Sequence, residues 1–113
     1  VTYSQGITNP LVANPILANI TVAEIDNHVF HLYVIRVAKR AALQAHLKAK
    51  GIDTVIHYPI PPHKQQAFRQ YNVLSLPVTE AIHKEVLSLP IGPTMTMGEV
   101  QTVIEAVNSF AGD

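Results

Sequence analysis

The densest run of hydrogen-bonding side chains in the sequence is His57-Tyr58-Pro59-Ile60-Pro61-Pro62-His63-Lys64-Gln65-Gln66. Its imidazole, phenol, ammonium and amide groups supply donors and acceptors, and its three prolines restrict the backbone. The imidazoles of His57 and His63 could bind an anion or transfer a proton near neutral pH. The pattern predicts a rigid loop that contacts a ligand. A solvated polar loop, with His57 hydrogen-bonded to backbone groups, is the alternative.

Six histidines raise the question of a metal site. His28 and His31 are three residues apart, a spacing that places them on opposite faces of a strand. A proline-rich turn separates His57 from His63, and no neighbouring carboxylate or thiolate completes a ligand set. The remaining two histidines each stand alone in helical sequence. We therefore expect no specific metal site.

Composition excludes several other classes of chemistry. The sequence has no cysteine, no G-x-S-x-G elbow, no P-loop and no G-x-G-x-x-G motif, so we expect no catalytic residue within it. Eight Lys+Arg balance eight Asp+Glu, which gives no electrostatic footprint for nucleic acid or an acidic membrane. No apolar run approaches the roughly 20 residues of a membrane span. The absence of cysteine fits a reducing cytoplasm, where we expect the protein to reside.

Three segments around the polar loop have the composition of extended chain. Residues 28–37, HVFHLYVIRV, are rich in β-branched and aromatic residues. Residues 52–58, IDTVIHY, end within the loop itself, and residues 87–90, LSLP, are short and extended. Together they predict a small sheet of about three strands.

Helices are expected on both sides of the loop. Residues 39–50 are nearly all good helix formers, and Gly51 follows where a left-handed residue ends many helices. We expect a short helix over residues 63–71. Pro77 marks another helix start, with Ser75 as its candidate N-cap and with an apolar stripe at Val78, Ile82 and Val86.

The last helix has the clearest amphipathic pattern in the chain. Thr96 and Glu99 form a capping-box pair at its start. Apolar residues then recur at spacings of three and four from Met97 to Phe110. The order of elements predicts an α+β fold with helices covering a small sheet.

The first part of the chain differs from the rest. Residues 1–27 contain no Lys or Arg, and Pro10 and Pro15 interrupt any helix. We expect residues 1–27 to form an extended arm or inter-domain segment and residues 28–113 to form the small α+β domain. The first residues, VTYSQG, contain neither an initiating Met nor a signal peptide, which indicates either a processed protein or a piece of a longer chain.

The charge content points to a missing partner. Of the 113 residues, 48% are hydrophobic and 14% are charged, against roughly 25% charged in an average soluble domain. A small domain has a large surface for its volume, so some of that surface should be apolar. We therefore expect the isolated chain to self-associate.

These residues resemble one enzyme family. The motifs are HLYVIR at 31–36, IHYPIPPH at 56–63 and LSLP at 87–90, with Pro93 and the helix end VIEAV at 103–107. Their order and spacing are similar to the C-terminal part of the DegT/DnrJ/EryC1/StrS family of sugar aminotransferases, which depend on pyridoxal phosphate. These enzymes make amino sugars on nucleotide carriers for lipopolysaccharide, other surface glycans and antibiotics.

The resemblance implies the small C-terminal domain of a fold type I aminotransferase. The family's large domain holds pyridoxal phosphate through a Schiff-base lysine, and that N-terminal domain would be the missing partner. None of the lysines Lys39, Lys48, Lys50, Lys64 and Lys84 stands in the family's lysine motif. The chain alone should therefore bind no cofactor and be inactive, whereas the full-length enzyme would be a homodimer.

The resemblance also assigns the polar loop a role. It implies that His57 and Tyr58 donate hydrogen bonds to oxygens of a nucleotide-linked keto sugar, with His63 binding the substrate more peripherally. The alternative is a non-enzymatic α+β module that stands alone, because residues 28–110 suffice for a core. Such a module would dimerise or bind a small ligand.

Overall fold

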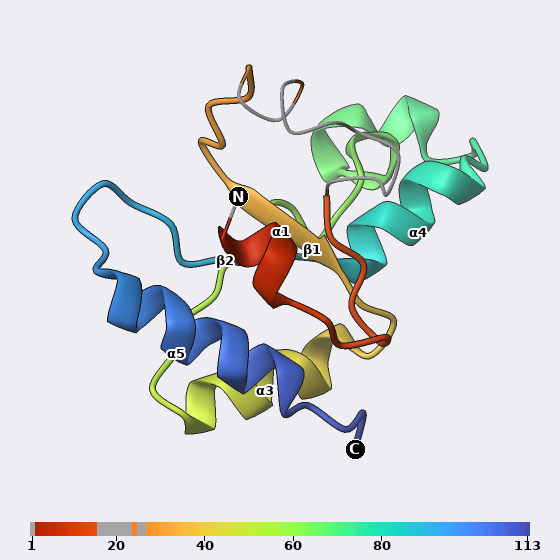
Figure 1. Ribbon diagram of the computed structural model, residues 1–113. Coiled ribbons are helices and arrows are strands. Elements are labelled where there is room, and N and C mark those ends of the chain that lie inside the picture. The colour runs from red at the N-terminus through yellow and green to blue at the C-terminus, as the bar shows by residue number, and fades with distance from the viewer. Residues whose placement is uncertain (1, 16–23, 25–26) are drawn as a thin grey trace.

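The computed structural model describes residues 2–15, 24 and 27–113 (Figure 1). Its elements are α1 (Thr2–Gly6), β1 (Tyr33–Arg36), α3 (Arg40–Ala49), the 3₁₀-helices η1 (Pro62–Lys64) and η2 (Gln66–Tyr71), α4 (Pro77–Glu85), β2 (Val86–Leu89) and α5 (Met97–Asn108). The predicted α+β class is confirmed. None of the helices in the described residues is long and apolar enough to cross a bilayer.

The sheet consists of two strands. β1 and β2 pair antiparallel, in a register that places Tyr33 opposite Leu89 and Arg36 opposite Val86. The third strand, expected at residues 52–58, is reduced to one isolated bridge between Val55 and Ser88. Prolines follow this segment closely and lack the N–H that a continuing ladder requires.

β1 is shorter than the sequence pattern predicts. The pattern places the strand at residues 28–37, whereas β1 begins at Tyr33. Phe30 has a φ of 43°, a left-handed conformation that few bulky residues adopt. Its backbone N–H donates to Nδ1 of His28, so a local turn replaces the start of the strand.

The hydrophobic core lies between the sheet and the helix pair α3 and α5, which run side by side in Figure 1. Leu43 and Leu47 form the buried seam of α3 at the predicted spacing of four residues. α5 contributes Val103, Ile104, Ala106 and Val107 to the same core. Burial of these side chains provides the main stabilisation of the part of the molecule formed by the sheet, α3 and α5.

Local capping signals have mixed outcomes. The Thr96–Glu99 capping box forms as predicted, and Gly51 adopts a φ of 76° just after α3. The predicted N-cap Ser75 is wrong, because α4 begins after Leu76. The predicted apolar stripe of α4 does not form a buried helix face, since no residue of this helix is buried, Val78 is exposed, and Val86 is buried in β2 instead.

The N-terminal segment packs on the domain. Thr2–Gly6 form α1 instead of extended chain, because the first proline follows only at position 10. Tyr3, Ile7 and Val12 join the core cluster. Residues 1, 16–23 and 25–26 of the expected arm lie outside the described residues, and the boundary after residue 27 stays a prediction.

Asn9 connects this segment to the end of α5. Its Nδ2 donates to the carbonyls of Val107 and Phe110, each at 2.8 Å, and its Oδ1 accepts from the Leu11 N–H at 3.0 Å. Asn108 at the end of α5 also contacts α1, because its Nδ2 donates to the Gly6 carbonyl. The two ends of the described chain are thus held together by the buried amide of Asn9 and the exposed amide of Asn108.

Candidate functional site

The polar loop, residues 57–66, follows the isolated bridge between Val55 and Ser88. Two residues later, Nδ1 of His57 lies 2.9 Å from the Ser88 hydroxyl on β2, within hydrogen-bond distance. The His57 ring meets the Tyr58 ring edge to face, with centroids 5.4 Å apart. Tyr58 is 64% exposed, so its phenol is accessible to a ligand. The half-buried His57 and the exposed Tyr58 therefore lie side by side at the start of the loop.

His63 has a different environment from the other two predicted site residues. It is only 6% exposed, and its Nε2 lies 3.0 Å from Oε1 of Glu80 on α4. Its carbonyl accepts a hydrogen bond from Nδ2 of Asn72 at 2.6 Å. The structure therefore uses His63 to join the loop to α4, and its predicted contact with substrate stays a prediction.

Glu80 is the polar centre of this junction. Its Oε1 also accepts the backbone N–H of Leu76 at 3.0 Å, and the Lys64 ammonium is 4.0 Å away. The hydrogen bond with His63, reinforced by the Leu76 N–H, lowers the pKa of the Glu80 carboxyl below its usual value. Glu80 is thus ionised at neutral pH and accepts both donors.

The loop also satisfies much of its own hydrogen-bonding capacity. Nζ of Lys64 donates to the carbonyls of Asn72 and Leu74 at 2.8 and 2.9 Å. Nε2 of Gln65 donates to the Ile60 carbonyl at 3.1 Å. These contacts order the loop without a ligand, and they involve neither Nε2 of His57 nor the Tyr58 hydroxyl.

Sequence reasoning missed three residues that hold this loop: Glu80, His83 and Ser88. Nδ1 of His83 lies 2.6 Å from the Tyr58 carbonyl, to which it donates. Glu80 and His83 are three residues apart, which places them on one face of α4. That spacing was the available signal, although nothing local identifies the loop as their partner.

The described residues do not identify a lysine for the pyridoxal phosphate that the resemblance implies for the full-length enzyme. A Schiff-base lysine must have a free amine. Nζ of Lys39 donates to the Gly112 carbonyl, Lys48 pairs with Asp53, and Lys64 is bound to two carbonyls. Lys50 and Lys84 lie exposed at helix ends. We derive no step through the cofactor from these residues, and no group of three potential metal ligands is found in the described part of the chain.

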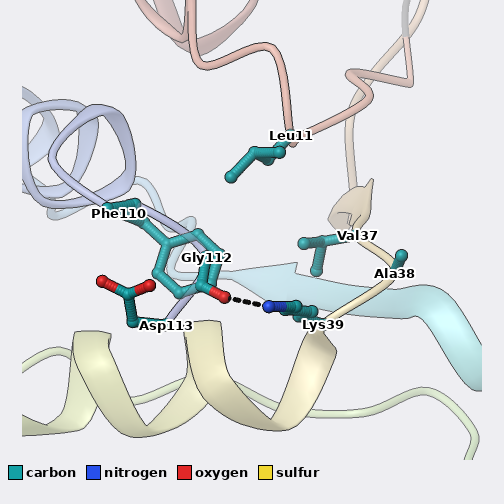
Figure 2. A pocket seen from close by; sticks show the side chains of 8 residues that line it. Leu11, Val37, Ala38, Lys39, Phe110, Gly112 and Asp113 are labelled. Atoms are coloured by element: carbon teal, nitrogen blue, oxygen red, sulfur yellow. Dashed lines mark hydrogen bonds between the residues drawn. The ribbon is translucent and has the colours of Figure 1, made fainter.

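A separate pocket of about 270 Å³ lies at the C-terminal end of the chain (Figure 2). Leu11, Val37, Ala38 and Phe110 give it a mostly apolar lining. The Lys39 ammonium beside it is already bonded to the Gly112 carbonyl, as the dashed line shows. The pocket contains no imidazole or phenol, so the His57–His63 loop remains the candidate site.

Curated relatives match almost all of this chain. It is 47% identical over 108 residues to the dTDP-3-amino-3,6-dideoxy-alpha-D-galactopyranose transaminase of Aneurinibacillus thermoaerophilus. It is 42% identical over 112 residues to the dTDP-3-amino-3,4,6-trideoxy-alpha-D-glucose transaminase of Streptomyces venezuelae. Each match covers 96% of this chain and 28% of the relative, so the chain spans little more than a quarter of their length.

Solved structures share the fold. The crystal structure of S. venezuelae DesV, in complex with a ketimine intermediate, superposes with a TM-score of 0.82 at 37% identity. That match covers 95% of this chain and 28% of DesV. Bacillus subtilis ntda, solved with bound cofactor PMP, gives a TM-score of 0.71 at 31% identity over 87% of this chain and 22% of ntda.

The family comparison agrees with the motifs. The model of the DegT/DnrJ/EryC1/StrS aminotransferase family matches residues 3–108, which include the two strands, the polar loop and α5. The expected resemblance is confirmed, and the chain belongs to the DegT/DnrJ/EryC1/StrS aminotransferase family.

Proposed function

We propose that this chain forms the substrate-side small domain of a nucleotide-sugar aminotransferase dependent on pyridoxal phosphate. The full enzyme would transfer an amino group to a nucleotide-linked keto sugar in the synthesis of lipopolysaccharide or another surface glycan. The observation that carries the proposal is the family match over residues 3–108, from a chain that spans 28% of two dTDP-sugar transaminases.

In this proposal, the loop binds substrate oxygens. His57 and Tyr58 donate hydrogen bonds to the sugar or the diphosphate, since Tyr58 is exposed and His57 uses only Nδ1 within the described structure. His63 has a peripheral part, because Glu80 already engages its Nε2. The hydrogen bonds that order the loop reduce the entropy lost when substrate binds.

The remaining functions belong to partners of this domain. The missing N-terminal large domain would supply the cofactor lysine, and two copies of the full-length enzyme would form a cytoplasmic homodimer. The chain alone would not transaminate. In support, three of its five lysines are occupied by hydrogen bonds or an ion pair in the described structure, and the other two are exposed at helix ends.

An absorbance experiment tests whether the lysine that binds the cofactor lies outside the 113-residue chain. The 113-residue chain is mixed with pyridoxal phosphate and compared with the complete polypeptide that carries it. We expect an aldimine band from one specific lysine in the complete polypeptide only. A stoichiometric, site-specific aldimine on the 113-residue chain would contradict the proposal.

A matched pair of tyrosine variants tests the loop. In the complete polypeptide, Tyr58→Phe should raise KM for the nucleotide sugar about three- to tenfold, the effect of one hydrogen bond. Tyr71→Phe removes the same hydroxyl from an exposed residue of η2 and should leave KM unchanged. Equal effects of the two variants would exclude a specific contact by Tyr58.

The completeness of the core favours a second candidate, a stand-alone module that dimerises or binds a small ligand. The core cluster consists of described residues of this chain, and none of their buried side-chain polar atoms lacks a hydrogen-bond partner. The coding sequence upstream of Val1 discriminates the two. An open frame of about two hundred or more codons supports the aminotransferase, and a start codon just before Val1 supports the module.

A further inference from the structure

One continuous segment, α4 followed directly by β2, holds the polar loop at three points. Glu80 bonds His63 at 3.0 Å, His83 bonds the Tyr58 carbonyl at 2.6 Å, and Ser88 bonds His57 at 2.9 Å. The first contact holds the loop near its end, and the second holds its backbone at Tyr58, near its start. The third acts on the imidazole at its start.

Ser88 is placed more rigidly than the other two. It is 4% exposed and lies opposite Val34 in the β1–β2 pair. Its N–H donates to the Val55 carbonyl at 2.8 Å, and its carbonyl accepts the Val55 N–H at 3.2 Å. Both backbone hydrogen-bonding groups of Ser88 are therefore engaged by Val55, and its hydroxyl is directed at the His57 ring two residues beyond Val55.

The position of the proton in this contact follows from what a buried hydroxyl requires. A buried O–H needs an acceptor, and Nδ1 of His57 is the only hydrogen-bond partner found for the Ser88 Oγ among the described residues. If Nδ1 carried the ring proton, the hydroxyl hydrogen would have no acceptor. Ser88 must therefore donate to Nδ1, which leaves the neutral ring protonated at Nε2.

We propose that Ser88 is a positioning residue that fixes His57 as the Nε2–H tautomer, so that Nε2–H can donate to an oxygen of the nucleotide sugar. Only one part of this inference, the hydrogen bond from Nε2–H to the nucleotide sugar, rests on the proposed function. Substrate oxygens on phosphate and sugar accept hydrogen bonds, so a donor is the form of His57 that they require. Ser88 touches no substrate in this scheme and acts through His57.

Imidazole ¹⁵N chemical shifts of the 113-residue chain test the first half directly. We expect His57 as the Nε2–H tautomer and His83, which donates through Nδ1 to the Tyr58 carbonyl, as the opposite one. Ser88→Ala should release His57 into a mixture of tautomers and leave His83 unchanged as an internal control. Ser75→Ala, which removes an exposed hydroxyl, should change neither ring.

Two results of this experiment would overturn the proposal. One is an Nδ1–H tautomer or a mixture at His57 in the unmodified chain. The other is an unchanged His57 spectrum in Ser88→Ala. Because His83 reports on the loop in the same spectrum, general loosening would move both histidines and is distinguished from the loss of one contact.

A binding cycle in the complete polypeptide tests the second half. The probes are dTDP-glucose and UDP-glucose, and the one with the lower Kd is kept for the variants. We expect His57→Ala to raise Kd about tenfold and Ser88→Ala about threefold, with the double variant no weaker than His57→Ala alone. Ser75→Ala should bind as the unmodified protein does.

The outcomes separate this proposal from the proposed function. If His57→Ala leaves Kd unchanged for the retained probe, the substrate role of the loop fails, and the inference that rests on it is overturned. If His57→Ala weakens binding while Ser88→Ala does not, the proposed function stands and the positioning role of Ser88 is overturned. Full additivity of the two substitutions also overturns that role, because independent effects are not transmitted through His57.

Discussion

This small domain has two halves, and each is stabilised by a different kind of interaction. Figure 1 shows the sheet with α3 and α5 on one side of the molecule and the 3₁₀-helices with α4 on the other. The first half contains all of the core cluster, including the fully buried Leu43, Leu47 and Leu87. Between Ile52 and Val86, the only buried residue is a histidine, His63.

The second half compensates with polar contacts. Glu80, His83, Asn72 and Lys64 hold the loop through side-chain hydrogen bonds. It also carries most of the exposed large hydrophobic residues found in the described chain: Val55, Tyr58, Ile60, Phe68, Tyr71, Val73, Leu74, Leu76 and Val78. The difference teaches that one half folds by burying apolar surface and the other keeps apolar surface available for contact.

Paired leucine truncations would break this comparison most strongly. Leu47→Ala removes a side chain with no exposed surface, and we expect it to lower the free energy of unfolding by about 2–5 kcal/mol. Leu76→Ala, at 42% exposed, should cost less than about 0.5 kcal/mol. Urea unfolding followed by circular dichroism measures both. Similar losses for the two variants would show that the halves are equally packed.

The buried amide of Asn9 tests whether polar contacts also matter in the first half. Asn9→Ala removes two donors and leaves the carbonyls of Val107 and Phe110 without their partner. We expect a loss of about 1–3 kcal/mol in the same unfolding experiment. Gln5→Ala truncates an exposed amide of α1 and serves as the control. A loss no greater than that of Gln5→Ala would mean that water replaces the Asn9 contacts freely.

Alkaline pH provides a smaller effect within the first half. Burial, with the neighbouring Tyr33, raises the pKa of Tyr3 to about 12 from an ordinary value of 10. A group whose folded pKa is raised stabilises the protein fully below pH 10 and loses that contribution as pH rises toward 12.

Tyr3→Phe checks this expectation. It should cost about 1 kcal/mol at neutral pH, because the hydrogen bond from the Tyr3 hydroxyl to the Pro90 carbonyl is lost. It should also make stability less sensitive to alkali between pH 10 and 12. Absorbance of tyrosinate at alkaline pH, recorded beside the unfolding curves, follows the ionisation. An identical alkaline profile in both proteins would refute the assignment to Tyr3.

Glu80→Gln should give the smallest change in global stability and sharpen the comparison in the second half. Without the carboxylate, the contacts with His63 and the Leu76 N–H weaken, so the amides of Lys64 and Asn72 should exchange hydrogen faster. Amides of α3 should exchange at unchanged rates. Glu105→Gln makes the same charge change on the exposed face of α5 and should not affect the loop.

The difference in loop amide exchange between the unmodified protein and Glu80→Gln should depend on pH, with a defined sign. The folded pKa of Glu80 lies below its usual value, so the contact contributes fully above the usual carboxyl range and is lost as pH falls through the folded pKa. As the solution is acidified, the hydrogen-exchange rates of the loop amides in the unmodified protein should therefore approach those in Glu80→Gln. A difference that grows on acidification would contradict the role given to the ionised carboxylate.

Elements with local signals could be predicted from the sequence. The leucine seam of α3, Gly51 after it and the Thr96–Glu99 box of α5 each lie within a few neighbouring residues. β2 was predicted as a short extended segment and confirmed. These features depend on spacing and backbone preference, which a single sequence displays.

Features that depend on distant partners could not be predicted. The start of β1 is set by the left-handed Phe30, although its neighbours favour a strand. Ser88 lies 31 residues from His57, and Glu80 lies 17 residues from His63. The sequence identified the loop and its donors, but only the tertiary fold shows which of them are already occupied.

The amides that join α1 to α5 have a consequence for synthesis. Asn9 contacts residues 98 and 101 positions later, and closing a loop of that length costs roughly 4 kcal/mol of chain entropy. Residues near the start of this segment therefore have no stable place until the end of α5 exists. As the ribosome releases this part of the protein, the first described helix should dock last.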